Sequence, residues 1–287
     1  MMEHRKQSNL KLGPVKQGYP YEAMRIDYED HLGIAWYCMN GYPRPCFSPQ
    51  LLNETLSWLD DLRHAPELKH IRYLVVTSDT PGAFNLGGDL KLFCSLIRAR
   101  DRQALMDYAT ACIQAVYQFH TGLDRDITTI SLVQGDALGG GFETAISGNV
   151  LIAEKSARMG MPEILFNLFP GMGALSFLSR KVGMVQAEKM ILSGRVYTAE
   201  EMFELGVVNI LVENGAGKQA AYDYIRRENK SRNGFSAVRR AQRCCNPVNY
   251  DELASVTAIW VDAALKLGAK DIRMMERLVK RQDAKLV

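Results

Sequence analysis

The sequence predicts an α/β fold in which a core of strands and helices is followed by a C-terminal helical subdomain. Short apolar runs rich in β-branched residues alternate with amphipathic segments as far as Gly171, the pattern of strand-to-helix crossovers. Two glycine-rich loops each follow such a run and open a helix. After Gly171 helical patterns predominate. We therefore expect a flexible arm over 1–20, an α/β core over 21–212 and a helical subdomain over 213–287.

Local signals along the chain define the elements. Residues 24–39 carry β-formers on either side of Glu29-Asp30-His31 and predict two strands. Ser48 and Pro49 are typical of a helix start. The same criteria predict strands at 71–77, 127–134 and 150–154, a helical region at 89–120 broken near Arg100-Asp101, and a helix at 142–147. The C-terminal part is predicted to contain one strand, 207–212, among helices at 172–182, 185–192, 199–205, 218–228, 237–245, 250–267 and 270–282.

Composition excludes several classes of protein. The net charge of +3 is too small to indicate a nucleic-acid-binding protein. No apolar run is long enough for a membrane span, and the polar N-terminus lacks the apolar segment of a secretory signal. The six cysteines form no C-x-x-C pair and the five histidines no metal-ligand spacing. We expect a cytoplasmic protein with reduced thiols and no metal site.

The stretch 266–285 is rich in basic residues. Against three acids, Asp271, Glu276 and Asp283, it carries Lys266, Lys270, Arg273, Arg277, Lys280, Arg281 and Lys285. A basic helical face can receive an acidic partner or a phosphate. A solvated helix is the simpler interpretation when nothing else is known.

Two glycine-rich loops are the first candidates for chemistry. They are AFNLGGDL at 83–90 and GDALGGGFE at 135–143. Each opens a helix, whose first N–H groups need an acceptor, and glycine lets a ligand approach the backbone closely. Two such loops that converge would form an oxyanion hole, whereas two tight turns are the alternative. The glycine spacing fits neither the P-loop nor the dinucleotide-binding fingerprint.

Two glutamates near these loops are candidates for acid/base catalysis. Glu143 is expected in the first turn of the helix after the second loop, where the helix dipole favours an anion. Glu163 follows Gly160-Met161-Pro162 in apolar company, so desolvation should raise the pKa of its carboxyl group. Such a carboxyl suits general acid/base work, and a loop-end salt bridge is the alternative. Spacing alone does not bring the two carboxylates together.

The two loops, followed by MGMPEILFNLFPGMG at 159–173, resemble the crotonase (enoyl-CoA hydratase/isomerase) superfamily in order, type and separation. The resemblance covers residues 24–212 and implies a crotonase (ClpP/crotonase-like) fold with a repeated ββα core. It implies an oxyanion hole at Gly88 and Gly140 and acid/base carboxylates at Glu143 and Glu163. It also implies an acyl thioester substrate without a separate cofactor, and a homo-oligomer that is a trimer or a dimer of trimers.

A longer set of segments resembles the diffusible signal factor (DSF) synthases of this superfamily: FNLGGDLKLFCSLIRARDR, GGGFE, PEILFNLFPGMGALSF and IWVDAALKLGAKDIRMMERLVKRQ. The resemblance implies dehydration of a 3-hydroxyacyl chain on acyl carrier protein, then hydrolysis that releases a cis-2-unsaturated fatty acid, a quorum-sensing signal. It implies an acyl pocket at Leu138, Met172, Trp260 and Leu278, where periodicity alone favours ordinary core packing. It also implies a signalling sensor protein as a binding partner.

Two other functions stay open at this point. One is an ordinary enoyl-CoA hydratase or isomerase, in which the basic C-terminal face would serve a CoA phosphate instead of an acidic carrier protein. The other is a regulatory protein that uses the fold as an interaction surface. The presence of both Glu143 and Glu163 argues against a purely non-catalytic role.

Overall fold

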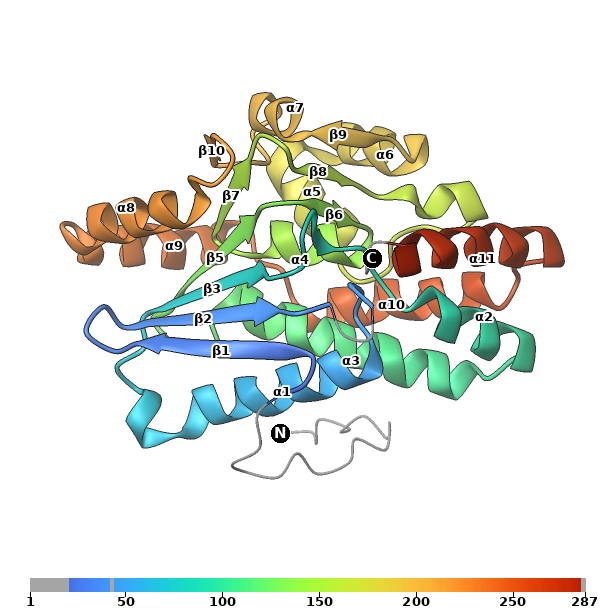
Figure 1. Cartoon of the computed structure of the whole chain (residues 1–287), viewed down its shortest axis with the longest axis horizontal. Coiled ribbons are helices and arrows are strands. Elements are labelled where there is room, and N and C mark those ends of the chain that lie inside the picture. The colour runs from blue at the N-terminus through green and yellow to red at the C-terminus, as the bar shows by residue number, and fades with distance from the viewer. Residues whose placement is uncertain (1–20, 42–43, 285–287) are drawn as a thin grey trace.

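Two β-sheets form the centre of the molecule, with helices packed around them (Figure 1). The computed structural model describes residues 21–41 and 44–284, with the backbone alone for 281–284. The arm expected over 1–20 lies outside the described residues.

The larger sheet has six strands in the order β1-β2-β3-β5-β7-β10. They are β1 (Met24–Glu29), β2 (Ile34–Met39), β3 (Tyr73–Ser78), β5 (Thr128–Val133), β7 (Val150–Glu154) and β10 (Ile210–Val212). β1 pairs antiparallel with β2, and the other neighbours are parallel. All residues of β2, β5 and β7 are buried, as expected for strands covered on both faces. Five of the expected strands are therefore confirmed in position.

The smaller sheet was not predicted. Its four strands, in the order β4-β6-β8-β9, are β4 (Ala83–Asn85), β6 (Asp136–Leu138), β8 (Arg158–Gly160) and β9 (Val196–Thr198). The expectation of a single strand after Gly171 is wrong, since both β9 and β10 occur there. The strand expected at 207–212 begins only at Ile210, because the N–H groups of Val207 and Val208 bond the Met202 carbonyl in a turn.

The chain repeats a strand–strand–helix unit, and this repeat positions the loops. β3 leads into β4 and α2 (Leu90–Ala99), β5 into β6 and α4 (Gly140–Ser147), and β7 into β8 and η2 (Pro162–Phe166). Each unit adds one strand to each sheet, and β4, β6 and β8 are mutually parallel. The segments that follow these three strands consequently leave the smaller sheet at one edge. The expected repeated ββα core is confirmed.

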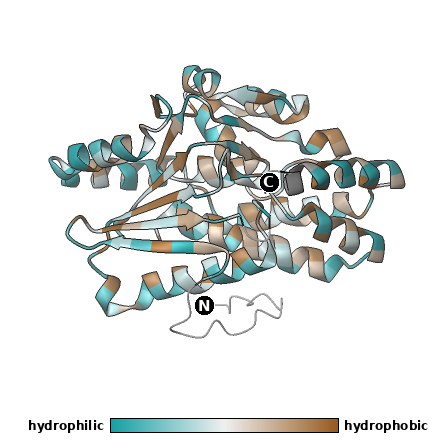
Figure 2. Ribbon diagram, in the orientation of Figure 1, coloured by the Kyte–Doolittle hydropathy of each residue, from teal (hydrophilic) through white to brown (hydrophobic). Residues whose placement is uncertain are grey.

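Helices cover both faces of the larger sheet. Alternate residues of β2 point to opposite sides: Tyr37 packs in the cluster with α1 (Pro49–His64) and α3 (Arg102–Thr121), and Trp36 packs in the cluster with α8 (Gly217–Asn229). Figure 2 shows hydrophobic residues along the strands between these layers and many hydrophilic ones on α8.

The remaining helices complete the C-terminal part. They are α5 (Ala174–Val182), α6 (Met184–Ser193), α7 (Ala199–Glu204), α9 (Arg232–Cys245), α10 (Tyr250–Ala264) and α11 (Ala269–Ala284), and η1 (Pro66–Leu68) lies earlier in the chain. α9 begins five residues before the expected start at 237. α10 packs on α3, and α11 packs on α2 and η2, so both helices reach back to the core.

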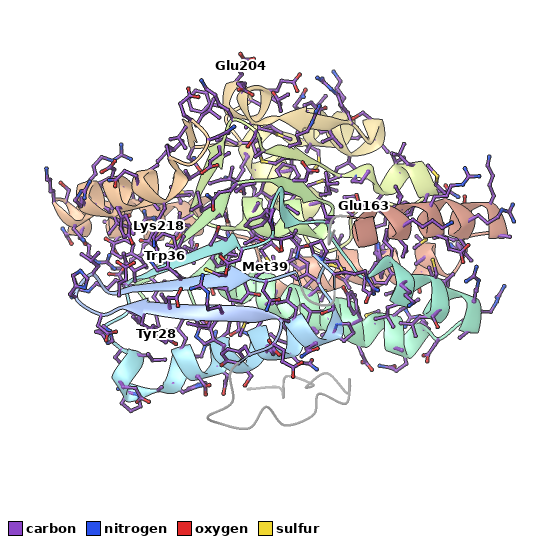
Figure 3. The ribbon with its side chains drawn as sticks, viewed as in Figure 1. Tyr28, Trp36, Met39, Glu163, Glu204 and Lys218 are labelled. Atoms are coloured by element: carbon purple, nitrogen blue, oxygen red, sulfur yellow. The ribbon has the colours of Figure 1, made fainter. Side chains whose placement is uncertain are left out.

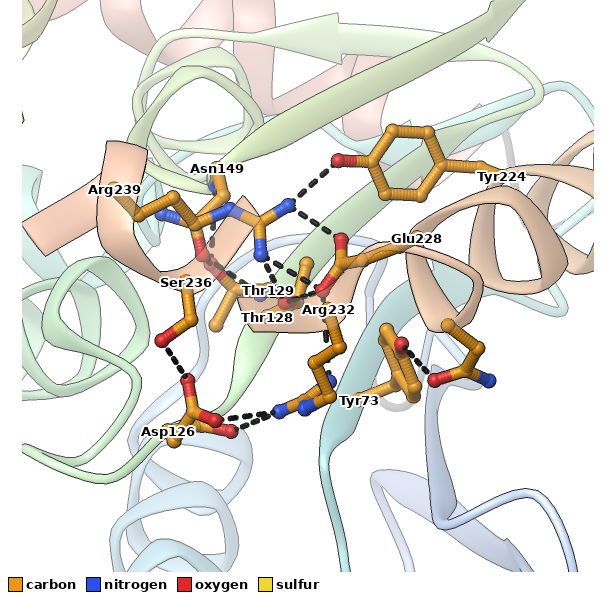
Figure 4. A network of polar contacts seen from close by, with 11 residues as sticks. Tyr73, Asp126, Thr128, Thr129, Asn149, Tyr224, Glu228, Arg232, Ser236 and Arg239 are labelled. Atoms are coloured by element: carbon orange, nitrogen blue, oxygen red, sulfur yellow. Dashed lines mark hydrogen bonds and ion pairs between the residues drawn. The ribbon is translucent and has the colours of Figure 1, made fainter. Parts of the chain in front are cut away.

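A buried polar network fixes α8 and α9 on the larger sheet (Figure 4). The Glu228 carboxylate in α8 accepts bonds from Thr128 Oγ1 of β5 at 2.6 Å and from Arg239 Nη2 of α9 at 2.5 Å. Arg239 also donates to the Tyr224 hydroxyl at 2.6 Å. One carboxylate thus joins two consecutive C-terminal helices to a strand that lies far earlier in the chain.

All six cysteines are free: Cys38, Cys46, Cys94 and Cys112 are buried, and Cys244 and Cys245 are exposed. The expectation of unpaired thiols is confirmed. Among the described residues, the helices are too short or too polar to traverse a lipid bilayer.

Candidate active site

All eight residues expected at the site line one cavity of about 310 Å³. They are Gly88, Leu138, Gly140, Glu143, Glu163, Met172, Trp260 and Leu278. The cavity lies at the edge of the smaller sheet, between the starts of α2 and α4 and the helices α10 and α11. The structure thus brings together groups that the sequence spreads from the first loop to the last helix.

The two glycine-rich loops converge. A Cβ built on Gly140 would lie 3.6 Å from the Gly88 nitrogen, and one built on Gly87 would lie 3.3 Å from the Gly140 nitrogen. Gly87 and Gly139 have φ of +97° and +51°, values that favour glycine. The amides of Gly88 and Gly140 are therefore neighbours at the cavity, which is the arrangement that an oxyanion hole requires.

Hydrogen bonds and an ion pair from side chains fix the backbone of the first glycine-rich loop. Asn85 Oδ1 accepts the Gly87 N–H at 2.9 Å. Asp89 caps α2 through the Leu92 N–H and pairs with Arg44 Nη2 at 2.9 Å. The Tyr108 hydroxyl donates to the Phe47 carbonyl at 2.5 Å and accepts the Asp89 N–H at 3.2 Å. These contacts fix the backbone on both sides of Gly88.

Phe93 was missed by the sequence analysis, although it explains why position 88 is glycine. A Cβ on Gly88 would lie 2.6 Å from Phe93 Cζ. The Phe93 ring is held edge-on between Trp260 and Tyr108, with centroids 5.1 Å from each, so it has little freedom to move away. Leu90 and Phe93, three residues apart on one face of α2, both line the cavity. The same spacing is typical of any helix face that packs on a core, so it does not single them out.

Glu143 is buried in the first turn of α4, as expected. Its Oε1 accepts the N–H groups of Met172 at 2.7 Å and Ala174 at 2.8 Å. Burial raises the pKa of Glu143 to about 7, while the two donated bonds act in the opposite direction. The carboxyl group is anchored through one oxygen and titrates near neutrality.

Glu163 lies in η2, beside α11 (Figure 3). Its Oε1 covers Gly139, because a Cβ there would lie 2.2 Å away. Its Oε2 is buried with no hydrogen-bond partner among the described residues. Burial, and then the charge of Glu143, raise the pKa of Glu163 to about 8. The expected rise in the pKa of Glu163 is confirmed. The alternative, a loop-end salt bridge, is not found for this carboxylate within the described residues.

The apolar wall of the cavity comes from several elements. Leu138 ends β6, Met172 precedes α5, and Trp260 and Leu278 belong to α10 and α11. Further apolar residues that were not predicted complete it: Leu86, Leu90, Phe93, Leu165, Phe166, Leu168 and Val196. The backbone of Gly171 packs directly against the Trp260 side chain, because a Cβ on Gly171 would lie 2.2 Å from Trp260 Cγ.

The outer face of α11 is basic. Arg273, Arg277 and Lys280 are exposed, whereas Glu276 is paired with Arg98 at 2.6 Å and Asp271 accepts the Gly268 N–H at 2.9 Å. The side chains of Arg281, Asp283 and Lys285 lie outside the described residues. Two acidic side chains of this helix thus have partners within the protein. The same helix contributes Leu278 to the cavity wall.

A family model described as enoyl-CoA hydratase/isomerase matches residues 39–242. The chain belongs to this family. Among known relatives, rat (Rattus norvegicus) mitochondrial methylglutaconyl-CoA hydratase is 31% identical over 195 residues, which are 68% of this chain and 59% of that protein. The human (Homo sapiens) protein of the same name is 30% identical over 73% of this chain and 62% of its own length. The chain thus spans about 60% of these relatives.

Solved structures with the same fold include enoyl-CoA hydratases. Enoyl-CoA hydratase from Bacillus halodurans superposes with a TM-score of 0.78 at 17% identity, covering 89% of this chain and all of that one. Pseudomonas aeruginosa DspI superposes with a TM-score of 0.64 at 22% identity, covering 94% and 100%. The expected crotonase fold is confirmed.

Enoyl-CoA hydratases of this family act on CoA thioesters without a separate cofactor. Within residues 21–41 and 44–284, His, Cys, Asp and Glu side chains form no group of three that could hold a metal ion. The carboxyl groups of Glu143 and Glu163 and the backbone of Gly88 and Gly140 line the cavity together.

Proposed function

We propose that the chain dehydrates 3-hydroxyacyl thioesters to 2-enoyl thioesters, with Glu143 and Glu163 as the acid/base pair. The observation that carries this proposal is the pair of buried carboxyl groups, with pKa values of about 7 and 8, in one cavity with the amides of Gly88 and Gly140. Groups that titrate near the working pH transfer protons efficiently in both directions.

In the proposed reaction the Gly88 and Gly140 N–H groups bind the thioester oxygen. One carboxylate removes the proton from C2, and negative charge moves to the oxygen, where the two amides stabilise it. The C3–O bond then breaks as the other carboxyl group gives its proton to the departing hydroxyl, so that water leaves and the 2,3 double bond forms. Loss of one oxyanion donor typically costs about 3–4 kcal/mol of transition-state stabilisation.

The narrower proposal is a DSF synthase, which follows from the sequence resemblance. In this proposal the substrate is carried on acyl carrier protein, the product is a cis-2-enoyl thioester, and hydrolysis releases the fatty acid. In the hydrolytic step water adds to the thioester carbon, and the sulfur leaves with a proton. Two observations support it: Trp260 and Leu278 line the cavity, and the exposed face of α11 beside them is basic, which suits an acidic carrier protein.

The second candidate is an enoyl-CoA hydratase, and the names of the curated relatives favour it. In that case the basic face of α11 would serve a CoA phosphate. A role in binding a signalling sensor protein, and assembly as a trimer or a dimer of trimers, stay predictions from the resemblance.

The deciding experiment offers the purified protein a medium-chain 3-hydroxyacyl thioester on acyl carrier protein and, in parallel, on CoA, with products identified by mass spectrometry. Free cis-2-enoic acid from the carrier-bound substrate is the expected result. Reversible hydration confined to CoA substrates would instead make the chain a hydratase. Turnover of neither substrate would overturn both candidates.

The carrier surface can be tested by reversing charge on α11. Arg273→Glu with Arg277→Glu should raise KM for the carrier-bound substrate and remove its salt dependence, because both side chains are exposed on this face. Lys230→Glu, an exposed residue after α8, is the matched control and should change neither. An equal effect of the paired change on the CoA substrate would indicate that the face binds a CoA phosphate.

A further inference from the structure

A second, apolar cavity of about 40 Å³ lies directly behind the candidate active site. It is buried between the larger sheet and the helices α1, α3 and α4. Its lining includes Met39 of β2, Cys112 and Val116 of α3, and Thr144 of α4. None of these four residues was singled out by the sequence or used in the chemistry above.

The wall between the two cavities is thin. Gly140 and Met172 line both of them, and a residue that touches both spaces makes the wall one residue thick at that point. Gly140 contributes only backbone there, with Phe47 packed alongside, 3.5 Å from where a Cβ would lie. The backbone of Met172 is held by Glu143, but its side chain is an unbranched thioether that adapts readily to a new neighbour.

The cavity suits hydrocarbon. Its lining is apolar apart from a few hydroxyl groups, and the Thr144 hydroxyl is buried without a hydrogen-bond partner among the described residues. A site that offers water so few partners stays dry, and its volume matches roughly three water-sized groups. Protein interiors contain few voids of this kind, and an empty one lowers stability.

We propose that this cavity receives the terminal carbons of the substrate's acyl chain. The inference rests on the proposed function, in which the thioester oxygen binds at the amides of Gly88 and Gly140. The chain passes Met172, whose side chain moves aside, and its end packs against Thr144 and Val116. Thr144 lies one helical turn beyond Gly140 on the same face of α4, so the cavity limits the longest chain that can bind productively.

The test measures kcat/KM for CoA or carrier-bound 3-hydroxyacyl substrates from butanoyl to tetradecanoyl. Val116→Leu adds one methylene and partly fills the cavity. It should lower kcat/KM for the longest chains by roughly tenfold or more, because one methylene in a hydrophobic pocket typically changes discrimination by that factor. The value for the shortest chains should stay unchanged. Val150→Leu is the matched control, a buried valine in the separate core cluster on the other face of the sheet. It should leave the chain-length profile as it is.

Thr144→Val provides a second variant that keeps the side-chain volume and removes the unpartnered hydroxyl. It should raise kcat/KM for long chains relative to short ones. Bound xenon, detected by diffraction from crystals under xenon pressure, should occupy the cavity in the wild-type chain and be excluded by Val116→Leu.

The outcomes separate the two proposals. If the wild-type chain turns over no substrate of any length, the proposed function fails, and the chain-end site fails with it. If turnover is present but Val116→Leu and Val150→Leu alter the chain-length profile alike, the chain-end site alone is overturned. Xenon that enters the Val116→Leu protein as readily as the wild type would also contradict it.

Discussion

At the scale of single residues, the two glutamates differ in how their oxygens are satisfied. Glu143 accepts two backbone N–H groups through Oε1, whereas Oε2 of Glu163 is buried without a partner in the described part of the chain. Both pKa values are raised, and the charge of Glu143 contributes to the rise at Glu163. Because the two carboxyl groups interact, they titrate as a coupled pair. Between the two deprotonation steps the pair carries one proton.

This pair predicts a bell-shaped pH profile. The singly protonated form, which has one acid and one base, predominates between about 7 and 8, so kcat/KM should be greatest there and fall on both sides. Glu143→Gln and Glu163→Gln should each lower kcat by about 10²–10⁴-fold, and each should remove one limb of the profile. Full turnover in both variants would show that the acid/base proposal is wrong.

A second prediction concerns Gly88. A Cβ on this residue would lie 2.6 Å from Cζ of the Phe93 ring, which Trp260 and Tyr108 hold in place. Gly88→Ala should therefore displace the ring and the oxyanion amide and lower kcat/KM, with a stability cost of about 1–3 kcal/mol for overpacking. Gly88→Ala combined with Phe93→Leu should recover part of both losses. If the double variant is no better than Gly88→Ala alone, the contact with Phe93 does not explain the glycine.

At the scale of elements, the start of α4 depends on close backbone contact with β4. A Cβ on Gly141 would lie 2.0 Å from the Asn85 carbonyl oxygen, which belongs to the backbone of β4 and has no easy way to move. The approach of α4 to the first loop thus requires glycine at this position.

Gly141→Ala should accordingly lower both the melting temperature and kcat/KM. Gly234→Ala is the matched control, because it also replaces a glycine within a helix but meets no described atom within 4 Å. There the change should be neutral or stabilising by up to about 1 kcal/mol, since alanine is the better helix former. Both effects are measurable by thermal unfolding together with the assay. A harmless Gly141→Ala would mean that α4 and β4 can separate without loss.

The longer buried strands could be predicted from the sequence, and the shortest strands could not. β2, β3, β5 and β7 are five or six residues long and consist largely of apolar and β-branched residues, which gives a clear strand signal. β4, β6, β8 and β9 have three residues each, too few to show a period of two. β4, β6 and β8 pair in parallel and β9 pairs antiparallel with β8, so the smaller sheet exists only through contacts between segments that are separate in sequence.

At the scale of the whole molecule, the Glu228 network joins the C-terminal helices to the larger sheet (Figure 4). Glu228 is buried, and hydrogen bonds from Arg239 and Thr128 lower its pKa against the effect of burial. Without Arg239, the buried Glu228 carboxylate keeps, among the described residues, only Arg232 Nη1, at the longer distance of 3.5 Å, as a charged partner. A buried charge that loses its main partner is more costly than the loss of the pair itself.

Arg239→Met should therefore lower the free energy of unfolding by about 3–5 kcal/mol. Arg102→Met is its control, because Arg102 pairs with Asp262 at 3.0 Å while both side chains are about half exposed; there the loss should be about 0–1 kcal/mol. Denaturant unfolding of the two variants measures both values. Similar losses would mean that the network does not hold α8 and α9 on the sheet.

Only part of the site could be predicted from the sequence, because the residues that complete its wall lie far apart along the chain. Glu143 and Glu163 are candidates from local context and from the resemblance, and Gly88 and Gly140 are candidates from the resemblance. Phe93 and Leu168, in contrast, become wall residues only when α10 packs back onto α3 and α11 onto α2 and η2. No local pattern distinguishes such residues from ordinary core, because the partner that makes them functional lies far along the chain.

The wall supplied by α10 and α11 has a consequence for synthesis on the ribosome. Trp260 and Leu278 are translated after both sheets, both glycine-rich loops and both carboxylates, and nascent domains begin to fold from their N-terminal side. A nascent chain that has reached α9 already carries Glu143 and Glu163 but lacks the part of the cavity wall that Trp260 and Leu278 supply. The complete cavity around the two carboxyl groups therefore forms only after α11 has been translated.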